Sequence, residues 1–282
     1  MVATGQLPIP QITARRFGAR CLPALTDDAL YERTGVRVAF TGRAGGVSEG
    51  PYSSLNLGNH VGDGPASVER NRALVLEALD AADVPLVVPS QVHGEVAVEL
   101  DDASPEALGA AREAALAGAD ALVATVPGIA ALLCFADCVP VIVVSPTGRF
   151  AVAHAGWRGV DNGVAAKAVR ALARADAAEL GEDAASGYNV YVGPHIHASC
   201  FETGADVRKR FEDRFGSSCI PDERHVDLLE ALTVGLEEAG IDRARVADAG
   251  VCTVCSCDEF FSYRAAGGIC GRHGAVAFRK AG

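Results

Sequence analysis

The sequence predicts an α/β (α+β) fold, in which a single domain has a mixed central β-sheet core flanked by helices. Short β-branched runs and amphipathic segments both occur, without the strict alternation of a fully parallel βαβ fold. Of the 282 residues, 49% are hydrophobic and 22% are charged, which is ordinary for a folded chain. Because no linker-like stretch or internal repeat divides the chain, we expect a single domain.

The first part of this domain combines a strand, a long polar loop and a helix. Residues 36–43 alternate and are β-branched, which predicts a strand that runs into a turn. Residues 41–64 are rich in Gly, Ser and Asn and lack a helical period. A loop of this length is typical of a ligand-binding segment, although a mobile surface loop has the same composition. Ser67 is the expected N-cap of the helix that follows.

The rest of the chain mixes buried strands with helices. Apolar runs of strand length predict the strands, and apolar residues at helical spacing predict the helices. In order, we expect two strands with a break in 86–100, a helix or insertion in 101–118, two or three buried strands in 119–146, a strand, a turn and a helix from near Asp161 in 149–175, a strand in 188–196, helices in 204–215 and 226–240, and a strand, a cysteine-rich loop and a final strand in 246–280.

Charge and composition exclude several classes of protein. The formal net charge of -11 argues against nucleic acid or an anionic membrane as the main partner. The N-terminus lacks the order of a secretory signal, and no apolar run reaches the roughly 18 residues of a membrane span. The nine cysteines are odd in number and scattered, which disfavours a disulfide framework. We therefore expect a cytoplasmic protein.

Three residues share one local context, in which an apolar strand meets a turn. They are His93 in "QVHG", Cys138 in "ADCVP" and His154 in "AHAGWRG". If neighbouring strand ends converge, two imidazoles and one thiolate would leave a fourth position open, as in a catalytic zinc site. The same donors suit copper. The alternative is that both histidines are hydrogen-bonded structural residues and that the cysteine belongs to the core.

Several motifs resemble the laccase-domain (YfiH-like) family. In order, these motifs are "TGRAGGVSEGPYSSLNLGNHVGD", "QVHG", "ADCVPVIV", "AVAHAGWRG", "VGPHI" followed by "CFETG", and "FFSYRAAGG". The family was long labelled polyphenol oxidase and is now described as metal-dependent purine nucleoside phosphorylase. The resemblance runs from about Val36 to the C-terminus, which implies a laccase domain over residues 36–282, preceded by an N-terminal extension over residues 1–35. It implies zinc on His93, Cys138 and His154, with Cu²⁺ also possible. It also implies phosphorolysis of adenosine, inosine and methylthioadenosine, with adenosine deaminase as a further activity.

The substrates of such an enzyme, a purine nucleoside and phosphate, require further groups. Phosphate needs cationic side chains and N–H donors. The candidates are Arg43 with the backbone of Gly45 and Gly46, Arg158, and Arg264, although each arginine could equally serve in a surface or ion-pair role.

Two polar residues complete the predicted catalytic set with Arg43. Asn56 could hold the loop or a ribose hydroxyl. Asp137, beside the thiol, could donate a proton or orient a neighbour.

A true multicopper laccase is disfavoured by composition. Met1 is the sole methionine, so no axial thioether is available for a blue-copper centre. The seven histidines are too few for a four-copper set, and His195-Ile-His197 is the sole His-x-His pair. His197 also departs from the usual family motif at this point, which leaves open a change in substrate access or an extra ligand.

The tail contains a second group of thiols. Cys252, Cys255, Cys257 and Cys270 are either buried thiols near the site or ligands of a structural metal.

Three other functions remain open from the sequence. The first is a metal-free Cys–His hydrolase with Cys138 as the nucleophile. The second is polyphenol oxidase activity of a copper-loaded form. The third is a nucleoside-binding protein without catalysis. The oligomeric state is not indicated.

Overall fold

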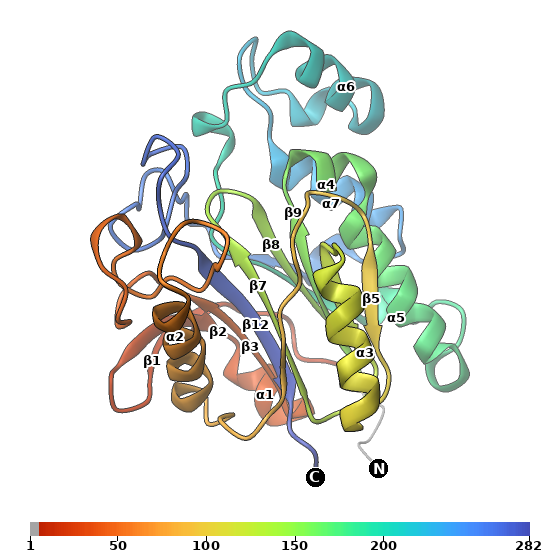
Figure 1. Ribbon diagram of the computed structural model, residues 1–282. Coiled ribbons are helices and arrows are strands. Elements are labelled where there is room, and N and C mark those ends of the chain that lie inside the picture. The colour runs from red at the N-terminus through yellow and green to blue at the C-terminus, as the bar shows by residue number, and fades with distance from the viewer. Residues whose placement is uncertain (1–5) are drawn as a thin grey trace.

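The strands of the computed structural model, which describes residues 6–282, form two six-stranded sheets (Figure 1). In the first sheet, antiparallel pairs predominate, and β4 pairs with β7 in parallel. Its order across the sheet is β1 (Thr13–Phe17), β2 (Leu22–Thr26), β3 (Val36–Thr41), β12 (His273–Arg279), β7 (Ile129–Phe135) and β4 (Leu86–Val87).

The second sheet is also mixed, with parallel pairs at its two edges. The four inner strands are joined by antiparallel pairing. Its order is β11 (Val246–Asp248), β10 (Asn189–Val192), β8 (Val139–Val144), β9 (Phe150–Ala155), β6 (Ala121–Ala124) and β5 (Ala97–Leu100).

Helices cover the outer faces of this two-sheet core (Figure 1). Helix α2 packs on the outer face of the first sheet, whereas α4, α5 and α7 lie against the second. The α-helices are α1 (Asp28–Thr34), α2 (Pro65–Ala78), α3 (Pro105–Leu116), α4 (Trp157–Asn162), α5 (Val164–Leu180), α6 (Ala205–Phe215) and α7 (Leu228–Glu237). Within residues 6–282, every helix is too short or too polar to span a bilayer.

The predicted fold class, a mixed α/β domain with flanking helices, is confirmed. The strands divide between two sheets rather than forming one, because the chain leaves the first sheet at the end of β7 and enters the second at β8. Both strands are buried along their whole length, since each has one face toward the other sheet and one toward the outer layer. A continuous apolar run is the sequence pattern of such a strand, and it does not reveal which sheet the strand joins.

Several local expectations change in the structure. Helix α2 begins at Pro65 with Gly64 as its N-cap, so Ser67 lies inside the helix rather than capping it. The helix expected from Asp161 is divided into α4 and α5 by Gly163, whose φ of 73° ends α4. The described part of the N-terminal extension contributes β1, β2 and α1, and β2 pairs with β3 of the predicted domain.

Candidate metal centre

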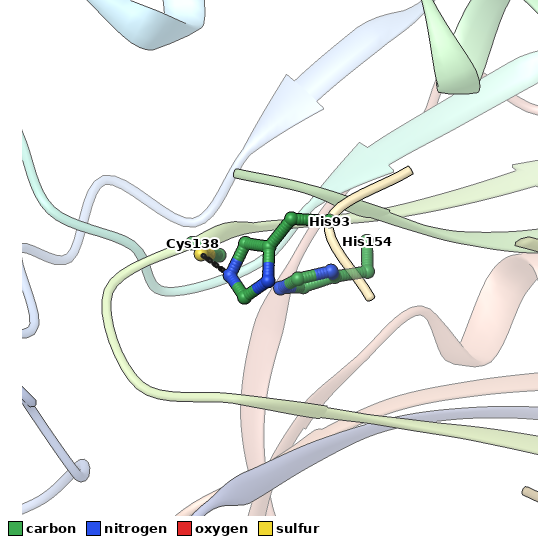
Figure 2. Close-up of side chains that lie close together, drawn as sticks. All are labelled: His93, Cys138 and His154. Atoms are coloured by element: carbon green, nitrogen blue, oxygen red, sulfur yellow. Dashed lines mark hydrogen bonds between the residues drawn. The ribbon is translucent and has the colours of Figure 1, made fainter. Parts of the chain in front are cut away.

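Three sequence-distant elements bring His93, Cys138 and His154 together. Cys138 directly precedes β8, and His154 lies in the paired strand β9, opposite Pro140. His93 lies in the loop between β4 of the first sheet and β5 of the second. Figure 2 shows the three side chains converging. Their ligand atoms all lie within 4.8 Å of one another, and Cys138 Sγ is 3.8 Å from His93 Nε2.

The loop that carries His93 is held by the carboxylate of Asp120. This carboxylate accepts hydrogen bonds from the backbone N–H groups of Val92, His93 and Gly94, at 3.2, 3.0 and 2.6 Å. His93 adopts a positive φ of 58°, a conformation that non-glycine residues adopt infrequently. Three hydrogen bonds to a fully buried carboxylate stabilise this turn and so position the His93 ring.

Asp120 also orients His154. Its Oδ1 atom lies 2.8 Å from His154 Nδ1, and its backbone carbonyl accepts the His154 N–H at 2.7 Å. With Nδ1 paired to the carboxylate, Nε2 is the ring nitrogen that remains for a ligand. Histidines that bind metal are commonly held in this way by a carboxylate on the second nitrogen.

The electrostatics of the site favour a thiolate at Cys138. Burial alone would raise the pKa of Cys138, but His154 and His93 hold it at about 6. Burial alone would lower the pKa of His154, whereas the neighbouring Cys138 thiolate and Asp120 carboxylate raise it to about 9. The Cys138 proton therefore passes readily to the His154 imidazole, and the Cys138 sulfur is available as a nucleophile or as a ligand.

The site leaves no room for a larger residue at Gly156. A Cβ atom at this position would lie 2.9 Å from Cys138 Sγ and 3.0 Å from His93 Cδ2. The absence of a side chain between β9 and α4 therefore allows Cys138 and His93 to approach one another.

The donor set fits a metal ion of the zinc class. Two imidazole nitrogens and one thiolate, with a carboxylate behind one imidazole, match the number and type of protein ligands in a catalytic zinc site that keeps a fourth position open. The same donors also accommodate copper, so the geometry indicates a metal site without selecting the metal.

The three residues open into a cavity of about 450 Å³, which is within the usual range for small-molecule sites. Two arginines, Arg264 and Arg272, supply positive charge to its wall. Aromatic and apolar side chains supply much of the remaining surface, namely Trp157, Ile196, Phe201, Leu228 and Tyr263. The cavity thus combines a candidate metal centre with separate cationic and apolar walls.

Two of the other predicted site residues, Asp137 and Arg264, line this cavity. Asp137 has a φ of 91° at the crossing from β7 to β8. Its carboxylate accepts hydrogen bonds from the Thr253 hydroxyl at 2.6 Å and from the Arg264 backbone N–H at 2.7 Å. Both oxygens of Asp137 are thus engaged in fastening the tail segment that bears Arg264.

The predicted residues of the Gly-rich loop lie in other surroundings. Arg43 donates to the carbonyls of Ser53 and Cys257 and stacks over Phe261, 4.5 Å from the ring centre. Asn56 is fully buried and bonds to Gly58, Asp63 and the Arg272 backbone.

The remaining predicted phosphate ligands lie as follows. Gly46 packs against Ser54 and Leu55, and Gly45 packs against Leu22. Arg158 stacks over Trp157, 4.3 Å from the ring centre.

Several cavity residues were not among the predicted ligands or catalytic groups. They include His60, Gln91, Tyr263 and Arg272, in addition to Asp120 behind the cavity. Gln91 lies two residues before His93 and bonds to both the N–H and the carbonyl of Cys134 at 2.8 Å, which ties the loop to β7. The sequence signal for Asp120 was an acidic residue directly before a buried strand.

The fold and this site define a class, an α/β protein with a candidate metal centre in a cavity between segments of both sheets. Residues 37–280 match the model of the family described as "Multi-copper polyphenol oxidoreductase laccase", and the chain belongs to this laccase-domain (YfiH-like) family. The family resemblance read from the motifs is confirmed.

Relatives with assigned names align over most of the chain. The chain is 34% identical over 253 residues to a Bacteroides thetaiotaomicron protein named purine nucleoside phosphorylase, covering 87% of this chain and 92% of that one. It is 33% identical over 236 residues to the Escherichia coli protein named purine nucleoside phosphorylase YfiH, covering 82% and 88%. The crystal structure of YlmD from Geobacillus stearothermophilus superposes with a TM-score of 0.78 at 30% identity, covering 98% and 100%.

Proposed function

We propose that the protein is a metal-dependent purine nucleoside phosphorylase. Its substrates would be adenosine, inosine and methylthioadenosine with phosphate, and its products a free base and a ribose 1-phosphate. The observation that carries this proposal is the convergence of His93, Cys138 and His154 within 4.8 Å at a cavity with two arginines. The names of the aligned relatives point to the same reaction.

In the proposed site, His93, Cys138 and His154 hold zinc, with copper as the alternative metal. Asp120 keeps the His154 ring in one tautomer and fixes the turn of His93. When bound, the cation supplies a Lewis acid that stabilises negative charge. A preorganised centre of this kind avoids reorganisation during the reaction.

The cationic wall suits the second substrate. In phosphorolysis a phosphate oxygen forms a bond to C1′ as the C1′–N9 bond breaks, and the electron pair leaves with the base, which takes up a proton. Arg264 and Arg272 would attract and orient the phosphate. Asp137 would act as a positioning residue, because its carboxylate holds the backbone of Arg264.

The apolar wall suits the nucleoside base. Tyr263 and Phe201 offer aromatic faces for a purine. Adenosine deamination, in which water replaces the amino group at C6 and ammonia leaves, would use the same cavity.

Nine free thiols are in keeping with a reducing, cytoplasmic setting.

The test combines metal analysis with product analysis on one preparation. We expect the wild-type protein to release hypoxanthine from inosine only with phosphate, and to form ribose 1-phosphate. The Cys138→Ala variant should lose both the metal of this centre and turnover while keeping its fold. Cys219→Ala is the matched control, because Cys219 is a buried thiol outside the cavity and its replacement should preserve both properties. Phosphorolysis by a metal-free Cys138→Ala protein would contradict the proposal.

A metal-free Cys–His hydrolase is the second candidate, favoured by one specific observation. Cys138 lies 3.8 Å from His93 Nε2, and its pKa is lowered to about 6 by the two histidines. A cysteine next to imidazole in this way can act as a nucleophile. Such an enzyme would release free ribose, would not require phosphate, and would retain its rate after chelation, so the same assay separates the two functions.

A further inference from the structure

A second group of soft ligands lies outside the candidate metal centre. Cys200 ends the short 3-10 turn Ala198–Cys200, whereas Cys252 and Cys255 belong to the tail segment after β11. The three Sγ atoms all lie within 4.8 Å of one another. Cys257 and Cys270, which the sequence placed with Cys252 and Cys255, fall outside this group: Cys270 packs with Ala136 and Phe261 in a small apolar cluster.

The sheet brings these distant cysteines together. Strands β10 and β11 run in parallel, and their pairing continues beyond the strand ends as a bridge between His195 and Cys252. His195 N–H bonds to the Val251 carbonyl at 3.2 Å, and Thr253 N–H bonds to the His195 carbonyl at 3.0 Å. The backbone therefore fixes the position of Cys252 beside the segment that leads to Cys200.

The sulfur geometry matches a thiolate metal site. Four ligands around zinc at about 2.3 Å in a tetrahedron place the sulfur atoms about 3.8 Å apart. Cys200 Sγ and Cys255 Sγ are 3.6 Å apart, far beyond the length of a disulfide of about 2.0 Å. The spacing Cys252-Thr-Val-Cys255 is the Cys-x2-Cys spacing common in structural zinc sites.

The backbone around Cys252 is arranged to receive negative charge. The His197 N–H points to Cys252 Sγ at 3.4 Å, and the N–H groups of Val254 and Cys255 also bond to this sulfur.

We propose that Cys200, Cys252 and Cys255 bind a second, structural divalent cation of the zinc class. The three thiolates leave the fourth position of a tetrahedral site open. This site would join the end of β10 to the tail, and the Cys200 carbonyl accepts a hydrogen bond from Arg264 at 3.1 Å. The second cation therefore fastens the segment against which a cavity arginine rests.

The first test uses two cysteines of one loop as an internal comparison. Cys255 and Cys257 are both exposed, but only Cys255 belongs to the proposed site. In the metal-free full-length protein both should react with iodoacetamide. Added zinc should slow alkylation of Cys255 by about tenfold or more and leave Cys257 unchanged, because a coordinated thiolate is a poorer nucleophile. Equal reactivity of Cys255 with and without zinc would overturn the proposal, as would a Cys200–Cys255 disulfide that forms in zinc-loaded protein kept under reducing conditions.

The second test counts the metal in variants and separates this proposal from the proposed function. Zinc-loaded wild type and Cys257→Ser should each hold two zinc ions, whereas Cys255→Ser and Cys138→Ala should each hold one. With cobalt in place of zinc, the ultraviolet sulfur-to-metal band should persist in Cys138→Ala and fall most in Cys255→Ser. If the first centre binds no metal, the wild type holds one ion and Cys255→Ser none, and the second site still stands. A Cys255→Ser protein with the metal content and cobalt spectrum of the wild type would refute it.

Discussion

Asp120 connects two of the three candidate ligands, so Asp120→Asn probes the centre without removing a ligand. Oδ1 faces the His93 N–H and His154 Nδ1, and Oδ2 faces the N–H groups of Val92 and Gly94. An asparagine has one carbonyl oxygen, so its amide group must face two of these four atoms. In either orientation, two of these groups lose their acceptor.

The expected magnitudes follow from these contacts. A typical hydrogen bond contributes about 0.5–1.5 kcal/mol, and the loop donors are only partly buried, so the free energy of unfolding of the metal-free protein should fall by about 1–3 kcal/mol. Loss of the carboxylate behind a metal-binding histidine typically weakens metal affinity by about 10–100-fold. That range corresponds to about 1.4–2.7 kcal/mol.

The assay is chelator competition for zinc, together with urea unfolding of the metal-free protein. Both are best done in a Cys255→Ser background, so that the tail cysteines do not contribute. Asp176→Asn is the matched control, because Asp176 is also fully buried and accepts hydrogen bonds from Tyr188 and Thr147 outside the cavity. The control should lose stability and keep its zinc affinity. Unchanged zinc affinity in Asp120→Asn would refute the role assigned to this carboxylate.

Three further predictions follow from the cavity and the core. Gly156→Ala should lower kcat/KM for inosine on the order of 10²-fold, because the new methyl group displaces Cys138 and His93. A variant with wild-type kinetics would contradict this steric argument. Arg272→Gln should raise KM for phosphate about tenfold or more with metal content unchanged, and an unaltered phosphate dependence would exclude Arg272 from phosphate binding. Burial lowers the pKa of His273 to about 3, despite the opposing Pro194 carbonyl. Below about pH 6.5 the unfolded chain takes up a proton on His273, whereas the folded protein does not do so until about pH 3. The free energy of unfolding should therefore fall by about 1.4 kcal/mol for each pH unit as the pH is lowered from about 6.5 to about 3. Urea unfolding at several pH values should show a weaker pH dependence of stability for His273→Leu than for the wild type. The same pH dependence in both proteins would contradict this prediction.

Local patterns pointed to the three residues of the candidate metal centre. His93, Cys138 and His154 each interrupt or follow an apolar run at a turn, and the structure brings them within 4.8 Å. The buried strands and amphipathic helices could also be predicted from local patterns, because burial imposes a characteristic hydrophobic pattern on each type of element. The division into two sheets was not readable, because β7 and β8 have equally apolar sequences and join different partners.

The residues that sequence reasoning missed act across long separations. Asp120 contacts residues 26 to 34 positions away, and no local pattern marks it as their common acceptor. Cys200 joins Cys252 and Cys255 only because a parallel strand pair continues past its ends, so the sequence grouped the tail cysteines by proximity instead. Arg43 and Asn56 stood out in a Gly-rich loop, where the structure shows them bonded to backbone groups; a role in catalysis remains a prediction for both.

The most direct test of the central claim is an anomalous-scattering map of zinc-loaded crystals, recorded at the zinc absorption edge. The account predicts a peak enclosed by His93 Nε2, Cys138 Sγ and His154 Nε2, separate from any peak at the tail cysteines. If crystals of zinc-loaded protein that is active in phosphorolysis show no anomalous density at that position, the assignment of the metal centre is wrong.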